Sequence, residues 1–431
     1  MNKTINSFSK LTKQQKIDWL AQNFIQNTEG SCLDELATFR HENAEFQRIF
    51  DGFSENTIAN FPMPYGIAPN FIINHKVYAV PMVIEESSVV AAAASAAKYW
   101  SQRGGFHAEV LGTVKVGQVH FTWSGDGDIL RGCFDDLKTT LMTESEPITA
   151  NMVQRGGGIL GIELIDFTAE EADYYQLRCT FETCNSMGAN FINSVLEQFG
   201  QTLEWFLAEK TGIEPVIVMC ILSNFTPNCL VRAWVECDIA DFHHEEAAFY
   251  AEKFRRAVRI ARIDSYRAVT HNKGIMNGID SVVLATANDF RAIEACAHAF
   301  AARDGQYRSL SDCTIENGRF KFWIDMPLAL GTVGGLTSLH PLARLSLDIL
   351  GQPSAAELMQ VIAVVGLAQN FAAVRSLVTT GIQRGHMKMH MTNILNHLGA
   401  SEAEMVAAQA FFVDKTVSFT AVRAFLETLR G

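Results

Sequence analysis

A glycine cluster at residues 156–161 constrains the fold more than any other feature. Its sequence matches a known nucleotide-binding pattern, but the residues that follow it do not suit the fold in which that pattern occurs. The letters GGGILG at residues 156–161 match the pattern G-x-G-x-x-G. That fingerprint binds dinucleotides when a strand precedes the glycines and a helix follows them. Here residue 161 leads directly into Ile162–Phe167, which reads as a strand. The sequence therefore argues against a Rossmann fold.

Length and charge limit the architecture and the partners. A chain of 431 residues, 48% of them hydrophobic, has material for a sizeable core and predicts two or three domains. The formal net charge of -12 argues against nucleic acid or an anionic membrane surface as a partner. The longest apolar stretches, Val89–Ala97 and Val361–Ala368, are shorter than the roughly 20 residues of a membrane span. We therefore expect a soluble protein.

Cysteine usage points to a reducing compartment. The chain has nine cysteines, an odd number, and no C-x-x-C pair. This pattern is typical of reduced thiols in a cytoplasmic protein and gives no support for a disulfide framework or a zinc site.

The pattern of elements predicts an α+β fold in three parts. Helical spacing in residues 11–49 is followed by strands in Phe71–Ile84 and by an Ala-rich helix, capped by Ser87 or Ser88, that runs to about Trp100. After residue 238 the chain reads as mainly helical, broken by glycine-rich loops at 273–278 and 331–335, with helical segments at 355–377 and 401–429. We expect a large, mainly helical domain (1–108 and 224–378), an inserted small α+β domain of ferredoxin-like, non-Rossmann type (109–223), and a helical C-terminal flap (379–431).

The inserted segment reads as strands and then one long helix. The predicted strands are Ala108–Val116, Gln118–Trp123, Ile162–Phe167 and Tyr175–Thr183, and residues 228–238 read as a further strand. A strongly amphipathic helix begins near Asn190. Met187, Gly188 and Ala189 stand directly before it, where free N–H groups attract phosphate. A plain N-cap by Asn190 is the simpler interpretation of the same residues.

Three segments hold candidate catalytic groups, each with an ordinary alternative. Lys273, between Asn272 and Gly274, could hold a developing oxyanion, although an exposed loop lysine is the more ordinary interpretation. Glu86 could donate a proton if apolar neighbours raise its pKa, and it could equally sit at a helix N-terminus for dipole reasons alone. Asp289 reads as a helix cap and could also pair with Lys273.

A histidine near the C-terminus is a further candidate. His386 and His390 have i, i+4 spacing, but no third ligand is evident, so we expect no metal. His386 follows Gly385 and is typical of a proton donor on a hinged element.

Together these segments resemble the hydroxymethylglutaryl-coenzyme A reductase family, in its soluble bacterial class II form. The stretch RAVTHNKGIMNG at 267–278 is the most specific match. The other matching stretches follow the family's order: 55–61, 64–71, 81–94, 155–158, 187–190, 288–292, 331–341, 365–370 and 381–387.

The resemblance implies a reaction and a role for each matching residue. The family reduces 3-hydroxy-3-methylglutaryl-coenzyme A to mevalonate and coenzyme A with two NAD(P)H, through mevaldyl-coenzyme A and mevaldehyde. Lys273 would polarise the reacting oxygen, Glu86 would deliver the proton, and Asp289 would link the two. His386, on a closing flap, would protonate the departing thiolate. The implied substrate-binding residues are Arg267, Ser88, Asn277, Asn224, Gln369 and Asn370. The implied cofactor-binding residues are Met187, Gly188, Ala189, Asn190 and Asn185, the last of which replaces the family's usual aspartate.

The resemblance also implies a cofactor and an assembly. Residues 148–155 contain no Asp or Glu to repel a 2′-phosphate, which favours NADPH, with NADH as the alternative because Glu146 lies close by. Family members form a homodimer with a shared active site, to which Lys273 and Glu86 come from different chains, and the dimers can assemble further. Three other functions stay open: NAD-dependent mevalonate oxidation, a non-catalytic acyl-coenzyme A binding protein, and a Cys-dependent acyltransferase.

Overall fold

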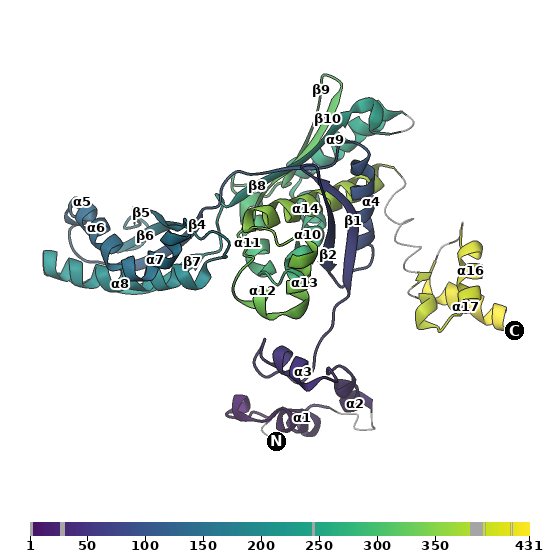
Figure 1. Ribbon diagram of the computed structural model, residues 1–431, viewed down its shortest axis with the longest axis horizontal. Helices are drawn as coiled ribbons and strands as arrows, with labels where there is room; N and C mark the ends of the chain where they lie inside the picture. Colours follow the sequence, from purple (N-terminus) through teal and green to yellow (C-terminus); the bar gives the residue numbers. More distant parts are fainter. Residues whose placement is uncertain are drawn as a thin grey trace.

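The computed structural model describes residues 3–25, 31–243, 246–379, 391–392, 394–413, 415 and 417–431. Helices and antiparallel sheets are mixed along the chain, so the predicted α+β class is confirmed (Figure 1). The strands are β1 Tyr65–Ile73, β2 Lys76–Val83, β3 His107–Val110, β4 Lys115–Thr122, β5 Gly158–Asp166, β6 Tyr174–Glu182, β7 Val216–Ser223, β8 Leu230–Asp238, β9 Ser311–Glu316 and β10 Arg319–Pro327. The helices are α1 Lys13–Asn23, α2 Ser31–Thr38, α3 Ala44–Asp51, α4 Val89–Ser101, α5 Gly127–Gly132, α6 Phe134–Glu144, α7 Glu146–Gln154, α8 Ala189–Thr211, α9 Ala247–Ile263, α10 Ser265–Ala285, α11 Phe290–Ala301, α12 Leu336–Leu339, α13 Pro341–Ile349, α14 Ala355–Val378, α16 Glu402–Phe411 and α17 Phe419–Arg430.

A four-stranded sheet of order β3-β8-β10-β9 forms the frame of the large core. Helices α9, α10, α11 and α14 and the hairpin β1-β2 pack with it around one continuous apolar cluster. The expectation of a mainly helical chain after residue 238 did not include the hairpin β9-β10. Alternate residues of β10 are buried, as in a strand with one face on the core, and Asn317 and Gly318 both have positive φ at the hairpin turn.

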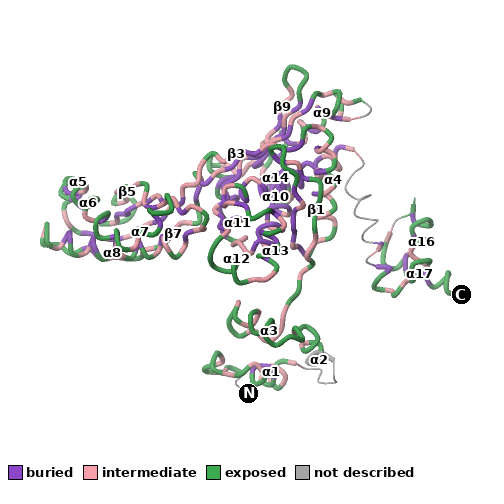
Figure 2. Tube along the Cα trace, in the orientation of Figure 1, coloured by how far each residue is buried: buried purple, intermediate pink, exposed green. Residues whose placement is uncertain are grey.

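Helices α10 and α14 cross at the centre of this core, where buried residues are concentrated (Figure 2). The predicted glycine-rich loop at 273–278 is wrong, because these residues form the middle of α10. The glycines permit close packing: a Cβ on Gly278 would lie 2.7 Å from the Val365 carbonyl oxygen, and one on Gly366 would lie 2.7 Å from Ile279. The segment at 331–335 is a loop, as predicted.

The second sheet, of order β5-β6-β4-β7, is antiparallel and carries α8 on one face. The triple glycine runs into β5, so the argument against a Rossmann fold is confirmed. Three differences from the prediction appear here. The predicted strand 108–116 is divided between β3 and β4, which belong to different sheets; α5, α6 and α7 fill residues 127–154; and β7 follows α8.

The helix α14 is long and apolar enough to cross a membrane by length and composition alone. It is also the most buried helix of the large core, as expected of the central helix in a soluble protein. The C-terminal helices α16 and α17 enclose a small apolar cluster of their own, with a break near residue 413 in the helical segment predicted over 401–429.

Candidate functional site

The largest described cavity that contains candidate residues lies between α4, α10 and α14 and measures about 800 Å³. Five residues proposed from the sequence line it together: Glu86, Ser88, Lys273, Asn277 and Gln369. They come from three separate parts of the chain, and the close crossing of α10 and α14 brings them together. The cavity is therefore the candidate active site.

The two charged groups of this cavity form an ion pair. The Lys273 Nζ lies 2.7 Å from Glu86 Oε2, and the Asn277 amide nitrogen lies 3.5 Å from the same oxygen. The pair is partly exposed and belongs to one chain, so the expectation that Lys273 and Glu86 come from different chains is wrong. Next to Lys273 on α10, a Cβ on Gly274 would meet nothing within 4 Å, so the space beside this glycine is open.

Two oxygen atoms of residues that line the cavity have no hydrogen-bond partner among the described residues. These atoms are Ser88 Oγ and Gln369 Oε1, and both are buried. Ser88 is the N-cap residue of α4 as predicted, but it has φ 79° and its side chain does not cap the helix. Because buried polar atoms are normally satisfied, each of these oxygens lacks a hydrogen bond that a buried group ordinarily has.

Arg267 stands on α10 before Lys273. Its guanidinium makes no hydrogen bond or ion pair with any other described residue, and burial lowers its pKa. A half-buried cation without a counter-charge favours an anionic ligand.

Asn370 faces away from the cavity into a buried network. Its side-chain oxygen accepts a hydrogen bond from Ser311 Oγ at 3.0 Å, and Ser311 Oγ also lies 2.6 Å from His271 Nε2. Burial and the nearby Arg267 lower the pKa of His271 to about 3, so His271 is neutral in this network. The structure thus shows Asn370 holding α10, α14 and β9 in register.

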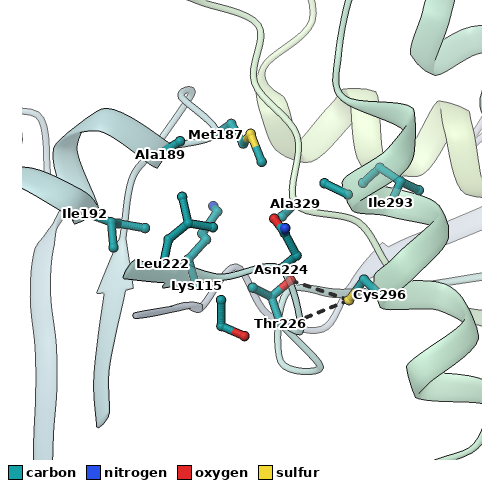
Figure 3. Close-up of a pocket in the computed structure, with 12 residues that line it drawn as sticks. Lys115, Met187, Ala189, Ile192, Leu222, Asn224, Thr226, Ile293, Cys296 and Ala329 are labelled. Atoms are coloured by element: carbon teal, nitrogen blue, oxygen red, sulfur yellow. Dashed lines mark hydrogen bonds between the residues drawn. The ribbon is translucent and has the colours of Figure 1, made fainter. Parts of the chain in front are cut away.

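A second cluster of candidates lies at the junction of the two sheets. Met187, Ala189 and Asn224 line a small pocket with residues of α11 (Figure 3). Asn224 therefore lies with the predicted cofactor residues and away from Lys273. Asp289 caps α11 through the amides of Arg291 and Ala292, so its predicted capping role is confirmed.

The start of α8 suits an anionic cofactor group. The N-cap is Gly188 with φ 90°, where a Cβ would lie 2.4 Å from Thr183, and no side chain caps the helix. The predicted cap by Asn190 is wrong, because Asn190 lies in the first turn and is exposed. Asn185 accepts a hydrogen bond from the Ala355 amide at 2.9 Å, so it fixes this loop against α14. Uncapped N–H groups at a helix start bind phosphate, so these residues fit a dinucleotide.

Asp280, two turns after Lys273 on α10, is a titratable group that the sequence analysis did not identify. Burial and the neighbouring Glu294 raise the pKa of Asp280 to about 8, and its Oδ1 is buried without a hydrogen-bond partner among the described residues. The hydrogen bond to His298 lowers the pKa of Glu294, so the pair keeps one proton, which lies on Asp280. The i, i+7 spacing from Lys273 could have suggested a shared helix face, but the partner on α11 could not be predicted.

We expect Asp280 to make folding less stable as pH rises. Between about pH 4 and about pH 8 the folded state keeps a proton that the unfolded state loses, so the free energy of unfolding falls with pH. Asp280→Asn removes this fall in stability with pH. The melting temperature of the variant minus that of wild type should therefore be larger at about pH 8 than at about pH 5. Thermal unfolding at both pH values measures this, with the exposed Asp304→Asn as control. A difference in melting temperature that does not change with pH would contradict the assignment.

His386 lies outside the described residues, as do Gly385 and His390. Within the part of the chain that the structure describes, no three His, Cys, Asp or Glu side chains gather as a metal site requires. The eight cysteines whose side chains are described are all free thiols.

Comparisons with known proteins agree on one family. The profile of the hydroxymethylglutaryl-coenzyme A reductase family matches residues 14–391. The 3-hydroxy-3-methylglutaryl-coenzyme A reductase of Archaeoglobus fulgidus is 35% identical, over 100% of this chain and 96% of that protein. A probable reductase of the same name from Borreliella burgdorferi is 37% identical, over 84% and 81%. The class II 3-hydroxy-3-methylglutaryl-CoA reductase from Streptococcus pneumoniae, solved bound to NADPH in open conformations, matches with a TM-score of 0.72 and 36% identity, over 98% of this chain and 100% of that one.

Proposed function

Because this chain belongs to the hydroxymethylglutaryl-coenzyme A reductase family, we infer that it reduces 3-hydroxy-3-methylglutaryl-coenzyme A to mevalonate and coenzyme A with NADPH. The observation that carries this function is the Lys273–Glu86 pair, which lines a cavity of about 800 Å³ together with Ser88, Asn277 and Gln369. The reverse direction, oxidation of mevalonate with NAD, is not favoured, since the solved relative carries NADPH. NADH stays an alternative cofactor.

In this proposal Lys273 and Glu86 have different roles at the reacting oxygen: Lys273 stabilises its negative charge and Glu86 delivers a proton to it. NADPH supplies the hydride when it is bound. The Lys273 ammonium donates hydrogen bonds to the thioester oxygen as negative charge develops there, and later to the oxygen of the aldehyde. Glu86, 2.7 Å from the ammonium, can hand a proton to that oxygen, and Asn277 orients its carboxyl group. His386 is proposed to protonate the thiolate of the departing coenzyme A.

The free carboxylate of the substrate needs a positive partner and hydrogen-bond donors. Arg267 supplies an unpaired guanidinium, and Ser88 supplies a buried hydroxyl without a protein partner. The amide of Gln369 can also serve the substrate, because its oxygen is buried and unsatisfied. Asn224 and Asn370 are weaker candidates for contact with the substrate, and Asn185 stays a candidate for the cofactor.

We further propose a homodimer whose active site takes residues from both chains. Asp289 follows α10, and about twelve residues of that helix separate Lys273 from its end, which at roughly 1.5 Å per residue is about 18 Å. Asp289 of the same chain therefore does not reach the ammonium, so the three-residue constellation of the family requires Asp289 from a second chain. The cofactor residues beside Asp289 would then approach Lys273 across the same interface.

The remaining assignments follow from this function. We propose a substrate-binding domain of residues 1–108 and 224–378, a cofactor domain of residues 109–223 and a flap of residues 379–431. The free thiols of the described cysteines suit a cytoplasmic enzyme.

We expect purified protein to oxidise NADPH only when 3-hydroxy-3-methylglutaryl-coenzyme A is present. The decrease in absorbance of the reduced cofactor measures turnover, and acetyl-coenzyme A serves as the control thioester. Two equivalents of NADPH should be consumed for each mevalonate formed, because a thioester is reduced to an alcohol. Binding of the thioester without turnover with either NADPH or NADH would overturn the assignment and would favour a non-catalytic binding protein.

A further inference from the structure

Lys115 is the first residue of β4, and only 4% of its surface is exposed. It lies on the inner face of the small sheet, because the buried residues of β4 alternate from Lys115 through Gly117 and Val119 to Phe121. The other described residues at these positions of β4 are apolar or glycine. A lysine in such a place requires an explanation, since burying an ammonium group is costly unless a counter-charge accompanies it.

The described residues supply no such counter-charge. Lys115 makes no ion pair and no hydrogen bond with any other described residue. The carboxylate nearest along the paired strands is Glu182, but Lys115 is opposite Phe181, so Glu182 points to the other face of the sheet. Glu182 also already accepts hydrogen bonds from the Thr113 hydroxyl and the Cys184 amide.

The side chain of Lys115 points into the pocket that lies before α8. Figure 3 shows its nitrogen directed toward Ala189 and Met187, with the Asn224 amide across the gap. The first-turn N–H groups of α8 begin at the same place, and no side chain caps them. An ammonium group and the positive end of a helix of 23 residues therefore converge on one point.

The size of the pocket restricts what can enter it. Its volume is about 20 Å³, which is space for one or two groups the size of a water molecule. A nicotinamide or adenine ring is far too large. A single phosphate oxygen fits.

We propose that Lys115 binds an anionic oxygen of the pyrophosphate of NADPH, together with the N–H groups at the start of α8. This assignment rests on the proposed function and adds a residue to it. The interaction is made with the part of the cofactor that NADPH and NADH share, so Lys115 contributes to affinity for both and does not select between them.

Lys115→Met tests this, because methionine keeps the length of the side chain and removes its charge. We expect the Kd for NADPH, measured by titration of its fluorescence, to rise about tenfold to a hundredfold. The Kd for NADH should rise by the same factor. The exposed Lys138→Met, on α6, is the matched control and should leave both values unchanged.

Thermal unfolding separates lost binding from misfolding. Without cofactor, Lys115→Met should melt at the wild-type temperature or above it, because a buried unpaired charge has been removed, and only the stabilisation by NADPH should be lost. An unchanged Kd for NADPH would overturn the proposal, and so would a loss confined to NADPH, which would place Lys115 at the 2′-phosphate. If the wild-type protein binds neither cofactor, the proposed function itself fails.

Discussion

Lys273→Met is expected to lower kcat by at least about a hundredfold to a thousandfold, the range found when one donor to a reacting oxygen is removed. The loss should be at least this large because Lys273 donates from a full positive charge. Arg375 is the other described lysine or arginine that lines the cavity, and it forms no ion pair with Glu86. Methionine keeps the length of the side chain. The measurement is steady-state turnover with saturating thioester and NADPH.

The fold should survive this substitution. The Lys273 side chain is 61% exposed and its ion pair is not part of the apolar core, so its contribution to the free energy of unfolding is about 1 kcal/mol or less. Far-ultraviolet circular dichroism and the melting temperature should therefore match wild type. Lys98→Met, an exposed lysine on α4, is the control for loss of a positive charge. Retention of more than about a tenth of wild-type kcat in Lys273→Met would remove Lys273 from the oxygen-binding role.

The sequence could predict the elements that have a regular pattern. The long helices α8 and α14 and the strand β8 were predicted because an apolar period of 3.6 or 2 persists over many residues. The exclusion of a Rossmann fold also needed only local context, since a strand follows the triple glycine. The hairpin β9-β10 was missed although its Asn317-Gly318 turn is a recognisable signal.

Other features depend on contacts between distant residues and could not be predicted. Gly274 and Gly278 suggested a loop because glycine weakens a helix, whereas the packing of α10 against α14 overrides that preference. Likewise, Lys115 and Asp280 carry no signal in the local sequence. Lys115 becomes notable only when its burial is known, and Asp280 only when α11 brings Glu294 beside it.

The structure brings five of the candidate residues into one cavity, but the prediction that Lys273 and Glu86 come from different chains is wrong. The ion pair of Lys273 with Glu86, and the cavity that they share with Ser88, Asn277 and Gln369, assemble within one chain. Asp289 is not among the residues that line this cavity, and it caps α11. If Asp289 acts on the cavity of a second chain, the assembly of two chains is required for activity.

Mixing two inactive variants should restore activity if the active site is shared. Lys273→Ala and Asp289→Asn are each expected to have little turnover alone. In a mixed dimer, one of the two sites combines the intact Lys273 of one chain with the intact Asp289 of the other, and the second site carries both substitutions. After unfolding and joint refolding of equal amounts, half of the dimers are mixed on random pairing, so about a quarter of wild-type activity should return.

The same experiment distinguishes a shared site from a site formed within one chain. In that case every site of a mixed dimer would carry one substitution, and no activity would return. Each variant refolded by itself is the control, and two differently tagged chains allow mixed dimers to be purified and assayed directly. Dilution supplies an independent check, because a shared site makes specific activity fall as dimers dissociate, whereas a monomeric site keeps its activity at every concentration. Recovery to about a quarter would therefore establish that Asp289 acts across the interface, on the Lys273 and Glu86 of its partner.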